Sequence, residues 1–236
     1  MVKRSDPSVR MRDYVRSISE WLQLPPRHID GIVLVENSGA DLSELREIFA
    51  ERNVHEYPVE IVQYNGNHIP DGLHYGYAEV AMIDRALQES ELLKRSPYFA
   101  KSTGRLFFPA FNDLLDRVPG HYDAVIDARW NIRKVHSPIP FATTQLMLFR
   151  RDFYLSTLAN RLDWFQPFVY PRQHVEHFVY EVLTQAKNPD VHFRFPINAD
   201  PMGTGAHQNR AYQSTSRRLE STIRGVSRRV APWAWL

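Results

Sequence analysis

The sequence predicts an α/β domain in which helices cover a mainly parallel sheet. Short apolar runs alternate along its 236 residues with longer segments whose apolar positions repeat at helical spacing, and this alternation is typical of parallel strands joined by helices. A chain of this length can bury a large core in one domain. No cysteine is present, which excludes disulfide frameworks, zinc–thiolate sites, iron–sulfur clusters and thiol nucleophiles.

The first half of the chain begins with a helix over 8–24, predicted by apolar side chains at helical spacing that end before Pro25 and Pro26. The apolar run in GIVLVENSG (31–39) predicts a buried parallel strand that ends in a turn-forming loop. Asp41 can cap the helix that follows. The further elements predicted here are a helix over 42–52, a strand over 59–65 and a helix over 75–95.

The second half continues the alternation of strands and helices. Its predicted elements are a third strand within 99–111, a fourth over 123–130, a fifth over 143–154 that turns into a helix, a helix over 173–186, a short strand over 191–195 and a polar loop over 198–210. In open α/β sheets, ligands bind at the carboxyl ends of the strands. The polar segments ENSGAD, YNGNH and DARW fall there, so we expect a site for a small polar ligand.

The net charge of +2 conceals a basic C-terminus. Residues 217–236 contain five arginines and one acid, a charge of +4, which leaves −2 for the rest of the chain. A basic nucleic-acid-binding body is therefore not implied, and we expect no nucleic-acid partner. No apolar run approaches the ~20 residues of a membrane span, and the first residues have no apolar signal-peptide core. We expect a cytoplasmic protein, with peripheral contact at the inner face of the membrane.

The basic segment 213–236 is predicted to be a tail that follows a domain over 1–212. Its arginines and two tryptophans favour docking on anionic lipid. Two alternatives remain open: an ordered tail packed on the body, or a disordered basic end. Gly225 and Pro232 are expected to limit a continuous helix.

Several common catalytic motifs are absent: the GxGxxG fingerprint, the Walker A loop and the GxSxG nucleophile elbow. His174-Val-Glu176-His177 has ligand-type residues at a spacing that matches neither HExxH nor HxxEH. It indicates either a polar pair near the surface or a metal-dependent hydrolase. The turn Lys101-Ser-Thr-Gly-Arg105 can offer two cations and backbone N–H groups to a phosphate, or it is a solvated loop.

The order of the segments resembles that of the GT-A-fold nucleotide-sugar glycosyltransferases. The segments that carry this resemblance are VLVENSGADLSELREIF, the helix that begins GYAE, SPYFAKSTGRLFFPAFNDLL, YDAVIDAR, QLMLFRRDFY and HVEHFVY. More narrowly, ENSG, GYAE, KxTGR and the late Glu-His-x-x-Tyr resemble a bacterial set that builds surface polysaccharides such as lipopolysaccharide or capsule. The resemblance covers roughly residues 5–212. It implies a GT-A-like three-layer sandwich whose first strand is missing or precedes the start of this sequence.

The resemblance implies transfer of a sugar from a nucleotide-diphosphate donor to a glycan or lipid-linked acceptor, with Glu176 as the base and inversion at the anomeric carbon. Lys101 and Arg105 replace the family's metal-binding Asp-x-Asp, so we expect electrophilic catalysis without a metal or other cofactor. The alternative is Mg²⁺ or Mn²⁺ held by Asp127 with Asp123. The residues expected to bind the nucleotide sugar are Glu36, Asn37, Ser38, Gly76, Glu79, Thr103, Asp127, Arg129 and His207, the last in a candidate lid over 201–207. The alternative interpretation is that the chain is a non-catalytic relative of these enzymes that binds a nucleotide or a glycan.

Overall fold

A computed structural model describes residues 6–66, 68–130, 140–162, 174–205, 212 and 215–230. The predicted α/β class is confirmed. Its elements are α1 (Pro7–Gln23), β1 (Ile32–Glu36), α2 (Ser43–Arg52), β2 (Val59–Gln63), α3 (Gly76–Glu89), α4 (Glu91–Arg95), β3 (Tyr98–Ser102), β4 (Leu106–Phe107), α5 (Phe111–Leu115), β5 (Ala124–Arg129), β6 (Phe141–Arg150), α6 (Arg151–Thr157), α7 (Val175–Gln185), β7 (Val191–His192), β8 (Met202–Gly203) and α8 (Thr215–Val230).

Side-chain caps explain several boundaries. The carboxylate of Asp6 accepts hydrogen bonds from the backbone N–H groups of Ser8 and Val9 at the start of α1. The helix expected over 75–95 is two helices, because Ser90 adopts an extended backbone and its hydroxyl accepts from Leu93 N to begin α4. The expected limit at Gly225 is not found, since α8 is continuous through it. Pro232 lies outside the described residues.

The strands of the described residues form two larger sheets. In one, β1 and β2 pair in parallel, as expected for strands joined by the helix α2. The other has the order β3-β6-β5-β7. Its β3–β6 and β6–β5 pairs are antiparallel, and only β5–β7 is parallel. The expectation of a mainly parallel sheet is therefore wrong for this part of the molecule.

The antiparallel return of β6 follows from the length of its connection. Only residues 130–140 join β5 to β6, which is shorter than the crossover of a dozen or more residues that a parallel pair requires. Apolar periodicity predicts that a strand is present but contains no signal for its direction.

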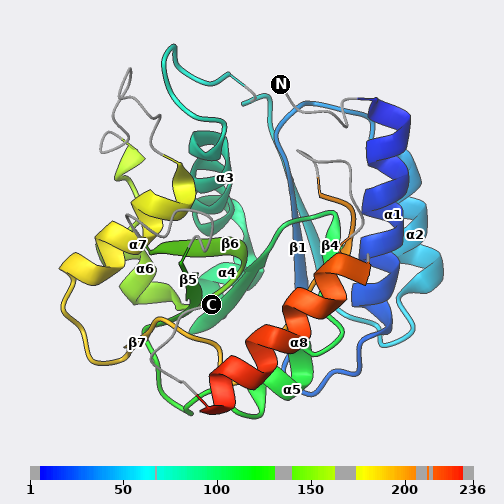
Figure 1. The fold of residues 1–236 in the computed structure, drawn as a ribbon. Coiled ribbons are helices and arrows are strands. Elements are labelled where there is room, and N and C mark those ends of the chain that lie inside the picture. The colour runs from blue at the N-terminus through cyan, green and yellow to red at the C-terminus, as the bar shows by residue number, and fades with distance from the viewer. Residues whose placement is uncertain are drawn as a thin grey trace.

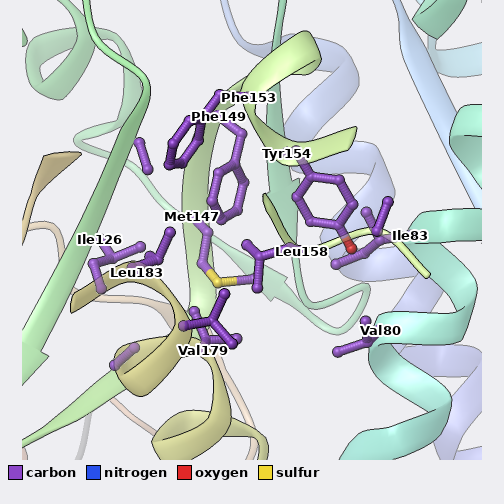
Figure 2. Packing of buried hydrophobic residues seen from close by; sticks show 14 of the residues in the cluster. Val80, Ile83, Ile126, Met147, Phe149, Phe153, Tyr154, Leu158, Val179 and Leu183 are labelled. Carbon is purple, nitrogen blue, oxygen red and sulfur yellow. The ribbon is translucent and has the colours of Figure 1, made fainter. Parts of the chain in front are cut away.

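Helices cover both faces of the four-stranded sheet. In Figure 1, α3, α6 and α7 lie on one side of the molecule, and α1, α2 and α8 lie on the other. Successive side chains of β5 point to opposite faces of the sheet. Ile126 packs in the core shared with α3 and α7, which Figure 2 shows, whereas Val125 packs in a second core with α5. A third core lies between α1, α2 and the β1–β2 pair. No described helix is long and apolar enough to cross a membrane.

Candidate functional site

The N-termini of α3 and α7 meet at the centre of the candidate site. A Cβ added at Gly76 would lie 2.5 Å from the Cβ of Val175, so only glycine allows the two helices to approach this closely. The imidazole rings of His74 and His174 lie against each other beside this contact, with centroids 4.2 Å apart and their planes tilted by 45°. Segments about a hundred residues apart in the sequence are thereby brought together.

Lys101 and Glu79 form an ion pair beside this junction. The ammonium of Lys101, on β3, pairs with the Glu79 carboxylate of α3 and donates to the carbonyl oxygen of Thr144 on β6. It also lies 3.3 Å from the hydroxyl oxygen of Thr103. The side chains of Lys101 and Glu79 are only 11% and 20% exposed, so the pair is largely shielded from water. Lys101 therefore contacts two other predicted site residues, Glu79 and Thr103.

Tyr75 adjoins Gly76 at the same junction, where the negative charges of Glu176 and Glu79 both act on it. Although 40% of the tyrosine is exposed, desolvation of its hydroxyl, followed by the negative charges of Glu176 and Glu79, raises the pKa of Tyr75 to about 12. Both carboxylates thus act on the same hydroxyl, which stays protonated near neutral pH and can donate a hydrogen bond. Oε2 of Glu176 is buried and has no hydrogen-bond partner among the described residues.

A late loop also reaches this cluster. Gln145 donates from its side-chain amide to the Tyr212 hydroxyl, and its carbonyl oxygen accepts from Thr103 N at 2.9 Å. The backbone N–H of Tyr212 donates to the carbonyl oxygen of Gly203 at 3.0 Å, which holds Tyr212 beside β8. Tyr212 also contributes to the raised pKa of Tyr75. His207 lies outside the described residues. Of the candidate lid, residues 201–205 are described, and Met202 and Gly203 form β8, which pairs with β4.

The loops after β1 and β2 lie side by side, as expected for the carboxyl ends of paired parallel strands. Ser38 bridges to Asn65, and Gly66 N donates to the carbonyl oxygen of Asn37 at 2.9 Å. The carboxylate of Glu36 accepts from the backbone N–H groups of Ser38 and Gly39 at 2.8 and 2.9 Å. The Ser38 hydroxyl also donates to Glu36. Glu36 therefore holds the loop together.

Asp127 and Arg129 lie on the opposite face of the sheet from Lys101. Asp127 is 1% exposed and accepts from Arg129 Nε at 2.8 Å and from Arg228 Nη2 of α8 at 2.6 Å. Burial alone would raise the pKa of Asp127, but the two guanidinium groups together outweigh burial and hold it below its usual value. The structure thus places both predicted ligand-binding residues in an internal ion-pair cluster.

The expected metal site of Asp127 with Asp123 is not formed. Asp123 immediately precedes β5, where its carboxylate accepts hydrogen bonds from Arg150 and Asn188. At ~3.3 Å per strand residue it lies about 13 Å along the strand direction from Asp127. No group of three histidine or carboxylate side chains in the described ranges is arranged to hold a metal ion. The ring centroids of His174 and His177 are 6.3 Å apart.

Arg105, expected to act with Lys101, lies elsewhere. The turn after β3 packs on α1, where a Cβ at Gly104 would lie 3.0 Å from the Tyr14 ring. Arg105 lines a hollow there together with Asp13 and Glu20 of α1. It makes no hydrogen bond to the Lys101 cluster within the part of the chain that is described.

Sequence reasoning missed four polar residues of the cluster: Tyr75, Thr144, Gln145 and Tyr212. Tyr75 is the sequence neighbour of Gly76, a predicted site residue, and this adjacency could have identified it. Thr144 and Gln145 lie within an apolar strand, and their partners come from distant segments. No local pattern could identify them.

Comparisons of the chain with protein-family models, with curated proteins and with solved structures find no match. The functional argument therefore depends on the residues and their geometry.

Proposed function

We propose that the chain transfers a sugar from a nucleotide-diphosphate donor to a hydroxyl group of a surface glycan or lipid-linked acceptor. The observation that carries this proposal is the shared position of Glu176, Tyr75 and the Lys101–Glu79 pair where α3 and α7 meet. Protein sites for polar ligands combine a few convergent donors and acceptors in this way. The segment order that resembles GT-A enzymes adds a second, independent support, and we include the GT-A-like arrangement in the proposal.

Glu176 is the proposed base. It lies in the first turn of α7, and its buried Oε2 atom has no partner in the described structure. As the acceptor oxygen bonds to the anomeric carbon, the bond from that carbon to the diphosphate oxygen breaks, and Glu176 takes the acceptor proton. A positioned base of this type contributes about 10²- to 10⁴-fold to the rate. In-line attack inverts the anomeric centre.

Lys101 is the proposed electrophile that meets the charge of the departing diphosphate. Its ammonium is held by Glu79, Thr144 and Thr103, so its position is fixed before the donor arrives. Because Arg105 lies against α1, we assign the electrophilic role to Lys101 alone. Asn37 and Ser38, at the carboxyl ends of the parallel strands, are the proposed contacts to the nucleoside.

The test is the release of nucleoside diphosphate from a panel of nucleotide sugars, with acceptor glycans and with excess EDTA. Glu176→Gln should lower turnover about 10²-fold or more while donor binding persists, and Lys101→Ala should lower it by a similar factor. Glu181→Gln, an exposed position on the same helix, is the matched control and should retain full turnover. Unchanged turnover in Glu176→Gln would remove this residue from the mechanism, and loss of turnover in EDTA would overturn the metal-independent step.

A non-catalytic nucleotide- or glycan-binding protein is the second candidate. The observation in its favour is that Glu79 already neutralises Lys101, which reduces the cation's capacity to stabilise a leaving group. This candidate predicts that nucleotides raise the melting temperature while no nucleotide sugar is consumed. Calorimetric binding measured beside the turnover assay separates the two.

A further inference from the structure

Helix α8 presents four apolar side chains to solvent, whereas Arg224, Ser227 and Arg228 face the protein. Leu219, Ile223, Val226 and Val230 are 63%, 52%, 55% and 69% exposed. Their spacing of four, three and four residues places them on one face of the helix. Figure 1 shows α8 lying along the outside of the body. We call these four residues the α8 stripe.

The opposite face of α8 is anchored by ion pairs. Arg228 is bonded to Asp127 at 2.6 Å and to the carbonyl oxygen of Phe195, and Arg224 pairs with Glu220 at 2.7 Å and with Asp200 at 3.5 Å. Both arginine side chains are less than 10% exposed. These contacts fix the rotation of the helix about its axis, so the stripe faces outward because the body holds the other side.

We propose that the α8 stripe docks on an anionic lipid surface. Arg224 and Arg228 are neutralised by their carboxylate partners, but the helix sequence contains three further arginines, Arg217, Arg218 and Arg229, and no further acid. Exposed apolar side chains on a helix rich in arginine are the features that bind anionic lipid interfaces. This inference concerns a surface on the far side of the sheet from Lys101, and it does not depend on the proposed sugar transfer.

Charge and area both argue against a second copy as the occupant. Two α8 helices face to face would bring together two segments that each contain more arginines than acids. Sixteen residues at ~1.5 Å each and a width of about 10 Å give a stripe of roughly 240 Å². A stable protein interface buries about 800 Å² on each partner. A lipid surface has no such minimum, because it adapts to the apolar side chains that enter it.

The test is flotation of the full chain with vesicles of phosphatidylcholine alone or mixed equally with phosphatidylglycerol. The mixed vesicles should recruit the protein, neutral vesicles should not, and added salt should weaken recruitment. Val226→Ser should lower the partition coefficient about threefold to tenfold, and the double variant Leu219→Ser with Ile223→Ser at least tenfold. Val54→Ser is the matched control, because Val54 is 66% exposed and lies outside α8; it should leave partition unchanged.

Circular dichroism and thermal melting of each variant establish that the fold is retained. Equal recruitment by neutral vesicles, or equal partition of Val226→Ser and Val54→Ser, would overturn the proposal. A dimer in sedimentation without lipid, lost in Val226→Ser, would also overturn it and identify a second copy as the occupant. None of these readouts involves a sugar donor, so failure here is distinct from failure of the proposed activity.

Discussion

The two faces of the four-stranded sheet use buried carboxylates in opposite ways. Toward α8, both oxygens of Asp127 accept hydrogen bonds from guanidinium groups, and the helix is anchored by them. Toward α3 and α7, Glu176 keeps a buried Oε2 atom without a hydrogen-bond partner among the described residues. Its neighbours there are Tyr75 and, beyond it, the Lys101–Glu79 pair.

This difference distinguishes a carboxylate that holds the structure together from one that is a candidate to act on a ligand. A buried carboxylate whose partners all come from the protein holds elements together, whereas one with an unsatisfied atom beside other polar groups is a candidate to act on a ligand. In the sequence, Asp127-Ala-Arg129 and Lys101-Ser-Thr-Gly-Arg105 both place charges near the end of a strand. Only the contacts show that the first is internal and that Lys101 faces the candidate site.

The largest effect is expected at Asp127. Asp127→Asn keeps the shape of the side chain but leaves Arg129 and Arg228 without their shared counter-charge. Since loss of one member of a buried ion pair leaves an uncompensated charge, the free energy of unfolding should fall by about 3–5 kcal/mol, measured by urea denaturation. The control is Asp152→Asn, whose carboxylate is 73% exposed in the first turn of α6; it should change stability by less than about 1 kcal/mol. Similar losses in the two variants would refute the internal role of Asp127.

The same carboxylate gives a pH signature. Its pKa in the folded protein is held below the usual value, so its contribution to stability is complete above the unfolded-state pKa of about 4 and is lost as pH falls through the folded-state pKa. Asp127→Asn removes this contribution. Plots of unfolding free energy against pH should therefore converge for the variant and the wild type below about pH 4.

A smaller effect, at the junction of α3 and α7, tests the geometry of the other face. In Gly76→Ala the new methyl group would lie 2.5 Å from the Val175 Cβ, and the strain should cost about 1–3 kcal/mol of unfolding free energy. Gly225→Ala is the matched control in α8, where no atom lies within 4 Å of the added methyl group. It should stabilise the protein by about 0.5–1 kcal/mol. Opposite signs are expected, and a stabilising Gly76→Ala would disprove the close approach of the helices.

Local patterns predicted much of the fold and less of the site. Capping residues and apolar periodicity are local, so they were sufficient for α1, α2, β1 and β2. The direction of β6 was missed because pairing depends on connections and partners distant in sequence. The split of the helix at Ser90 was missed because its capping hydroxyl lies within a pattern that is otherwise continuously helical.

For the site, two separate motifs, KxTGR and GYAE, contained the residues that the structure brings together, Lys101 with Thr103 and Glu79. Strand alternation was the signal that could have separated Asp127 from them, since neighbours in β5 face opposite sides. Alternation alone does not show which side Asp127 faces, because every residue from Ala124 to Ala128 is buried. The composition of the strand also does not indicate which helices cover each face. Arg105 was misplaced for a similar reason: the turn that contains it packs on α1, a contact between distant segments.

The smallest expected effect on stability is at Glu176. Its contrast with Asp127 directly tests the difference between the two faces. Glu176→Gln loses a favourable carboxylate at the N-terminus of α7, worth about 0.3–1 kcal/mol, but it also removes a partly buried charge whose Oε2 atom has no described partner. The two terms oppose each other, so the unfolding free energy should change by less than about 1 kcal/mol, several-fold less than for Asp127→Asn. Urea denaturation of both variants at neutral pH makes the measurement. If Glu176→Gln cost as much as Asp127→Asn, Glu176 would be a structural anchor, and a large loss of turnover in that variant could no longer be attributed to a missing base.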